Sequence, residues 1–298
     1  MAEVVTFATS DQLLVVIDPV ALRTDGESVR IAKDVLSAGA ATKVCLPEGP
    51  EEFARALARR GSRRPVVVGD DRALLRAVSL LHRRRELAEC VLSVVPVGAA
   101  LSLAGSLGVP TGAVAAARAV LDGVERRLDL LVDDSDGVVL GALRIPPIRD
   151  PAGPAGRNGA DGALGANGAT AAGPGAGRSW LRTCQSLVRT LAPSRATSAA
   201  APGPSRLRVE IDGTTLVDLD QPLEAVSVAP GATGVAEVEV RPASVGAEAS
   251  PLLAEGRTVT VSGAHFRYRA DGVVSGPVRT RTWVVREGAW GLTVPGAG

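Results

Sequence analysis

Hydrophobic and polar positions follow two different spacings along the first half of the chain. Short runs of consecutive apolar residues are typical of buried strands, and segments with an apolar residue every three or four positions are typical of amphipathic helices. The expected strands cover residues 13–19, 42–47, 65–69 and 91–96. The expected helices cover residues 25–39, 49–61, 72–89, 99–107 and 112–123. This alternation predicts a parallel sheet with helices on both faces.

From residue 207 the hydrophobic spacing becomes two. The first such segment, 207–219, contains Asp212-Gly213, a pair typical of a tight hairpin turn, and further alternating segments continue to the end of the chain. They predict an antiparallel β domain or sandwich. Between the two halves lies a segment rich in Pro, Gly and Ala, which can bury little apolar surface. We therefore expect three parts: an α/β domain over 10–145, a linker over 146–205 with a short helix at 179–192, and an antiparallel β domain over 206–296.

A long uncharged stretch, 90–117, is the one candidate for a membrane span. Prolines and glycines interrupt it at short intervals, so we expect a strand and two helices of the core instead. The opening residues lack the basic segment of a signal peptide. Three cysteines, Cys45, Cys90 and Cys184, lie far apart and suggest neither a disulfide framework nor a zinc site, and we expect Cys90 to be part of the core. These features favour a cytoplasmic protein without a transmembrane segment.

Composition narrows the classes of partner. The formal net charge is +1 and aromatic residues make up 2% of the chain, which argues against a nucleic-acid partner. The scarcity of lysine beside abundant Ala, Gly and Arg is typical of a high-GC, actinobacterial genome. Two basic segments, 59–64 and 82–86, are interpreted as helix-end charges on solvated faces, with a lipid-headgroup surface as the alternative. The two histidines have no spaced partner, so no metal site is expected.

The segment 66–78, VVVGDDRALLRAV, joins a strand to a helix. Such a junction points backbone N–H groups at whatever lies above it. Its turn holds one glycine and two carboxylates, Asp70 and Asp71. They could be a metal-binding pair, although we favour an N-cap in a solvated turn for Asp70 and leave both interpretations open for Asp71. The segment 129–137 resembles a calcium loop but lacks its terminal Glu, so a hairpin turn is favoured there.

Four segments carry a resemblance to a known family. They are VVIDPVALRTDG at 15–26, the 66–78 junction, PVGAALSLAGSLGVP at 96–110 and RADGVVSGP at 269–277. Together they resemble the catalytic domain of diacylglycerol kinases, lipid kinases related in fold to NAD kinases, over most of the chain outside 146–205. The resemblance implies a nucleotide-binding α/β domain of that type, followed by an antiparallel β domain whose last strands return to the first. It implies ATP and Mg²⁺ as cofactors if the protein is active, and it places nucleotide-binding positions at Asp18, Gly69, Asp71, Arg72 and Gly98.

The residues that depart from this family are those expected to touch phosphate, metal or the acceptor hydroxyl. Asp70 and Arg72 stand for glycines, Leu101 stands for an asparagine, and Val273 occupies the position of the family's general base. Only Asp271, two residues earlier, is a weak candidate to replace that base. We therefore predict a degenerate homologue that has lost phosphoryl transfer and acts as a binding or scaffold protein for a protein or lipid partner. An active ATP-dependent lipid kinase with an atypical site is the alternative, and a homodimer is left open.

Overall fold

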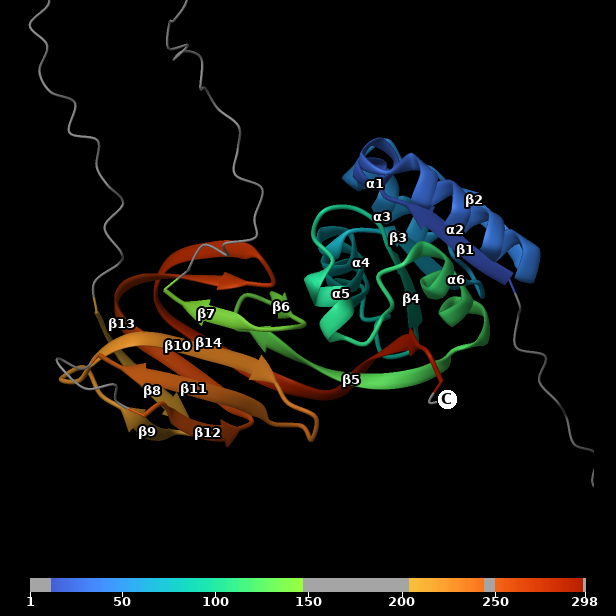
Figure 1. Ribbon diagram of the computed structural model, residues 1–298. Coiled ribbons are helices and arrows are strands. Elements are labelled where there is room, and N and C mark those ends of the chain that lie inside the picture. The colour runs from blue at the N-terminus through green and yellow to red at the C-terminus, as the bar shows by residue number, and fades with distance from the viewer. Residues whose placement is uncertain (1–11, 147–203, 244–249, 297–298) are drawn as a thin grey trace, which may run out of the picture. The chain divides into compact units, whose positions relative to one another are not determined.

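The computed structural model describes residues 12–146, 204–243 and 250–296 (Figure 1). The expected helix at 179–192 and Cys184 lie outside the described residues. Among those that are described, the helices are α1 (Pro19–Thr24), α2 (Gly26–Gly39), α3 (Pro50–Ala58), α4 (Asp71–Arg83), α5 (Ser102–Ser106) and α6 (Ala113–Asp122). The strands of the first half are β1 (Gln12–Ile17), β2 (Ala41–Cys45), β3 (Arg64–Gly69), β4 (Val91–Pro96), β5 (Val124–Asp133), β6 (Val138–Val139) and β7 (Leu143–Ile145). The later strands are β8 (Ser205–Ile211), β9 (Thr214–Val217), β10 (Pro222–Pro230), β11 (Ala236–Pro242), β12 (Leu252–Gly256), β13 (Thr258–Ala270) and β14 (Val273–Val294).

The first four strands pair in parallel, in the order β2-β1-β3-β4. Successive residues of β1 point to opposite faces of this sheet. Leu13, Val15 and Ile17 share a core with α2 and α6, whereas Leu14 and Val16 share a core with α3 and α4. Helices therefore cover both faces, as the spacing of apolar residues predicts. The uncharged stretch 90–117 contributes β4, α5 and the start of α6, and no helix of the described residues is long and apolar enough to cross a membrane.

The antiparallel half continues the same hydrogen-bonded sheet and does not form a separate sandwich. Residues Gly291 and Leu292, near the end of β14, pair in parallel with β4. The end of the chain therefore returns to the first half, as the resemblance implies. Further along, β14 pairs with β5 and β13. Strands β7, β10, β8 and β13 pair one after another in a closed ring, whose inner residues form a core around Trp283. The expectation of a sandwich is corrected here, because strands β5 and β7 of the first half pair with strands of the second.

Several element boundaries differ from the sequence prediction, two of them for clear reasons. The helix expected over 72–89 ends at Arg83, because Arg85 takes a left-handed conformation (φ 60°) and its N–H bonds back to the carbonyl of His82 at 2.9 Å. The separate segments expected between 278 and 295 belong to the single strand β14, whose pairing with β5 shifts register between Arg286 and Trp290. In contrast, the hairpin at Asp212-Gly213 is confirmed, with positive φ at both residues.

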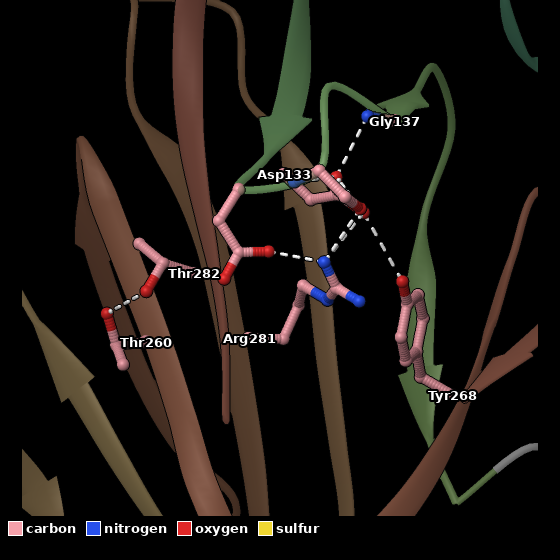
Figure 2. Close-up of polar contacts among 8 residues, drawn as sticks. Asp133, Gly137, Thr260, Tyr268, Arg281 and Thr282 are labelled. Atoms are coloured by element: carbon pink, nitrogen blue, oxygen red, sulfur yellow. Dashed lines mark hydrogen bonds and ion pairs between the residues drawn. The ribbon is translucent and has the colours of Figure 1, made fainter. Parts of the chain in front are cut away.

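A polar cluster fixes the turn that follows β5 (Figure 2). The carboxylate of Asp133 accepts hydrogen bonds from the N–H of Gly137 at 2.8 Å and from the hydroxyl of Tyr268 at 3.3 Å. The guanidinium of Arg281 lies 3.9 Å from the same carboxylate and also bonds Asp134. Burial acts to raise the pKa of Asp133, but these bonds and the positive charge of Arg281 outweigh it and lower the pKa. The segment at 129–137 is thus a hairpin turn held by the protein's own groups, as expected.

Candidate functional site

The carboxyl ends of β1, β3 and β4 meet at one edge of the parallel sheet, and each leads into a helix start. This edge is the usual position of ligand sites in open α/β sheets, because helix N-termini there present unpaired N–H groups to anions. The residues singled out from the sequence lie at this edge or near it. A ligand can use these N–H groups only if they do not already donate hydrogen bonds within the protein.

Asp18 ends β1 and is almost completely buried, with 2% of its surface exposed. Its Oδ1 accepts a hydrogen bond from the N–H of Val20 at 2.8 Å, which makes it the N-cap of α1. Its Oδ2 lies 2.6 Å from Nη1 of Arg76, and the Arg76 guanidinium lies over the ring of Phe53. Both oxygens of Asp18 are therefore engaged within the protein. Arg76 was not expected from the sequence, although it lies one helical turn after Arg72 on the same face of α4.

Asp70 is the N-cap of α4, as favoured from the sequence. Its Oδ1 accepts from the N–H groups of Arg72 and Ala73, both at 3.1 Å. These are the donors that a phosphate would use at this helix start. The side chain of Arg72 is exposed to solvent.

Asp71 belongs to the first turn of α4, yet its carboxylate caps a different helix. It is 8% exposed and accepts hydrogen bonds from the N–H of Leu103 at 2.9 Å and of Ala104 at 3.0 Å. The hydroxyl of Ser102 lies 3.3 Å from Oδ2. Helix α5 has no side-chain cap from its own N-cap residue, Leu101, so Asp71 supplies the missing acceptor. Among the described residues no group of three or more metal-ligating side chains comes together.

Two glycines allow these elements to approach closely. A Cβ added at Gly69 would lie 2.6 Å from the Cβ of Ala73 and 3.0 Å from the Cβ of Asp18, so this glycine lets β3 pack against both segments. Gly98 has φ +132°, a conformation that L side chains rarely adopt, and its added Cβ would lie 3.1 Å from the Cβ of Asp70. The family's glycines at these positions thus have a packing role in this chain.

Asp271 lies in the turn between β13 and β14 and has φ 44°. Its Oδ2 accepts from the N–H of Leu140 at 2.7 Å and its Oδ1 from the N–H of Gly141 at 2.8 Å. Burial raises the pKa of Asp271, and the nearby charge of Asp71 adds to the rise, whereas the backbone hydrogen bonds oppose it. The structure therefore brings Asp271 within electrostatic reach of Asp71. Val273, which begins β14, is 45% exposed and carries no group that takes up a proton.

The architecture defined by these pairings is a mixed α/β fold of the diacylglycerol kinase type. The chain is similar to crystal structures from Bacillus anthracis str. Sterne that are assigned as diacylglycerol kinases. One has a TM-score of 0.67 at 11% identity, over 97% of this chain and 98% of that one. Another has a TM-score of 0.62 at 11% identity, over 95% and 97% of the two chains. No family model matches the sequence, and no curated protein matches it significantly, so the likeness shows the fold.

Proposed function

We propose that this chain is a degenerate homologue of the diacylglycerol kinases that no longer transfers phosphate and acts as a binding or scaffold protein. One observation carries the proposal. At the carboxyl edge of the parallel sheet, the N–H groups of Val20, Arg72, Ala73, Leu103 and Ala104 all donate to carboxylates of the chain itself. A nucleotide phosphate at this edge would have to displace these bonds.

Electrostatic repulsion also weakens nucleotide binding at this edge. Each unit negative charge of a phosphate placed about 4 Å from Asp70 would be repelled by about 1 kcal/mol in water and by about 4 kcal/mol at an effective dielectric constant near 20. Two arginines could offset this repulsion, but Arg76 is paired with Asp18 and Arg72 is exposed to solvent, which screens its charge. Binding of ATP is therefore expected to be weak, with Kd no better than about 1 mM.

The acceptor side of the site supports the same proposal. Val273 stands at the position of the family's general base and cannot take a proton. Both oxygens of Asp271 accept short backbone hydrogen bonds, which hold the carboxylate against the turn at Leu140 and Gly141. Without a free base, a bound nucleotide would lack help in deprotonating an acceptor hydroxyl.

One observation favours the second candidate, an active lipid kinase with an atypical site. A partly buried carboxyl group with a raised pKa near a second carboxylate is a common environment for a general base, and Asp271 with Asp71 has this arrangement. In that case Asp271 would take the proton of the acceptor hydroxyl, Asp71 would organise Mg²⁺ and Arg72 would clamp phosphate.

The two candidates are separated by calorimetry with ATP and Mg²⁺ and by a phosphotransfer assay with diacylglycerol. We expect no turnover and no binding tighter than about 1 mM. The variant Asp70→Gly frees two N–H donors and removes one negative charge, so it should gain nucleotide affinity while remaining inactive. The matched control is Asp25→Gly, because Asp25 is also an N-cap aspartate but caps α2, where its Oδ1 accepts from Ser28 at 3.0 Å. Micromolar binding by the unmodified chain, or turnover that Asp271→Asn abolishes, would establish the active kinase instead.

A further inference from the structure

The two basic segments noted in the sequence come together at the edge of the parallel sheet opposite to the candidate site. Helices α3 and α4 both run away from the carboxyl edge and end near the start of β3 and β4. Arg60, just after α3, and Arg84, just after α4, share the carboxylate of Glu86: Arg60 bonds Oε2, and Nε of Arg84 lies 2.9 Å from Oε1. Segments 59–64 and 82–86 therefore form one surface.

A third segment joins this surface from β5. Nη1 of Arg127 donates to the carbonyl of Ala88 at 2.7 Å, and Arg127 is in register with Gly291, which pairs with Val91 at the start of β4. We call the resulting set the basic edge. It consists of Arg59, Arg60, Arg63, Arg64, Arg83, Arg84, Arg85 and Arg127.

The basic edge carries more positive charge than its own structure neutralises. Four carboxylates lie on it or against it, those of Glu86, Glu89, Glu125 and Asp136, and the last of these is bonded to His82 and faces Arg83 and Arg85. The C-terminal dipoles of α3 and α4 add a negative charge equivalent to about one unit. Eight arginines therefore leave an excess of about three positive charges on a chain whose formal net charge is +1. Within the described residues, no ion pair is formed by Arg59, Arg63, Arg64, Arg83 or Arg85.

An apolar groove begins at the same surface. It has a volume of about 360 Å³ and lies between β2 and α3. Its lining is Leu14, Cys45, Leu46, Pro47 and Ala56 together with Lys43, Arg55, Arg59 and one carboxylate, Glu52, which pairs with Arg55 at 3.6 Å. Arg59 belongs both to this groove and to the basic edge. Leu46, which follows β2, is 60% exposed and is the exposed apolar side chain of this groove.

We propose that the basic edge and this groove bind an anionic phospholipid surface. Cations beside an exposed apolar side chain match an amphiphile with a negative headgroup, and clustered arginines near a bilayer each add to its attraction for anionic lipids. Single-stranded nucleic acid fits less well, because its bases stack on aromatic side chains and these make up 2% of the sequence. The proposal goes beyond the proposed function and does not rest on loss of catalysis, since the basic edge and the candidate site lie at opposite ends of the strands.

The test is co-sedimentation of the full chain with vesicles. Vesicles of phosphatidylcholine mixed with phosphatidylglycerol should bind the protein at low salt and release it at about 0.5 M salt, where the Debye length is only a few ångströms. Pure phosphatidylcholine vesicles should bind much less. The variant with Arg59→Gln, Arg83→Gln and Arg85→Gln changes exposed side chains only and should weaken binding on the order of 100-fold, about fivefold for each arginine.

The matched control carries Arg118→Gln, Arg267→Gln and Arg279→Gln, three exposed arginines of α6, β13 and β14. It has the same net charge as the first variant and should bind vesicles like the unmodified chain. Equal binding to both vesicle types, equal loss in both variants, or no binding at low salt would overturn the proposal. Competition by millimolar inorganic phosphate would also overturn it, because that result indicates a discrete phosphate site. If the first variant fails to fold, as judged by circular dichroism, the proposal is still tested by the dependence of binding on lipid charge and salt in the unmodified chain.

Discussion

Replacing Asp71 tests whether this buried carboxylate is a structural cap or a ligand for nucleotide and metal. The change Asp71→Ala leaves the N–H groups of Leu103 and Ala104 without their acceptor in a buried position. Each unsatisfied buried donor costs about 1–3 kcal/mol, and part of this is offset because the buried charge is also removed. We therefore expect the free energy of unfolding to fall by about 2–4 kcal/mol. For a domain of this size the melting temperature should fall by about 5–15 °C.

The assay is urea unfolding followed by tryptophan fluorescence. Trp283 and Trp290 are completely buried and report on the antiparallel core and on the core beneath α4. The conservative change Asp71→Asn keeps one acceptor oxygen and should cost less than Asp71→Ala. Asp25→Ala removes an exposed N-cap and should cost least. An unchanged unfolding midpoint in Asp71→Ala would refute the capping role, and unchanged stability together with lost ATP turnover would make Asp71 part of a working site.

Three further outcomes are expected. Because burial raises the pKa of Asp271, the folded chain holds this proton at pH values where the unfolded chain, with a carboxyl pKa of about 3.9, has lost it. Stability should therefore fall as pH rises from about 4, and urea unfolding should show a shallower fall in Asp271→Asn. Gly98→Ala should lose about 1–3 kcal/mol through backbone strain, and full rescue by Asp70→Gly would show that the contact with that side chain is the whole cause. His82 lowers the pKa of Asp136, so His82→Gln should move that pKa toward its ordinary value in an NMR titration, and an unchanged value would refute the 2.8 Å contact.

Local elements of the first half could be predicted because each is encoded within a few residues. The β-branched run at 65–69 and the acid-to-base gradient over 49–61 identify a strand and a helix without reference to the rest of the chain. Helix α1 was missed although its signal is present: Asp18 followed by Pro19 is a typical N-cap and first helical position. Strand β12, Leu252–Gly256, has no such signal, because its sequence LLAEG does not alternate.

The organisation of the second half and the partners of the candidate site could not be predicted, because they depend on long-range pairing. A hydrophobic spacing of two shows that one face of a strand is buried, but it does not identify the neighbouring strand. In the same way, the sequence around a polar side chain does not identify its hydrogen-bond partner. Asp71 bonds Leu103 over 32 positions, and Asp271 bonds Leu140 over 131. Both aspartates can be singled out from the sequence, but their backbone partners carry no distinguishing side chain.

The three aspartates at the carboxyl edge differ in how easily each could be replaced by a residue that leaves room for phosphate. Asp18 neutralises the partly buried Arg76 and Asp71 holds the buried start of α5, so removing either leaves polar groups without partners. Asp70 bonds only two N–H groups at a partly exposed helix start, and replacing an N-cap aspartate by glycine costs only a few tenths of a kcal/mol. A threonine at position 73, by contrast, would add two atoms to a side chain that is completely buried against Gly69. Asp70 is therefore the position at which nucleotide affinity could be raised without loss of the fold, and this is why the proposed function is tested there.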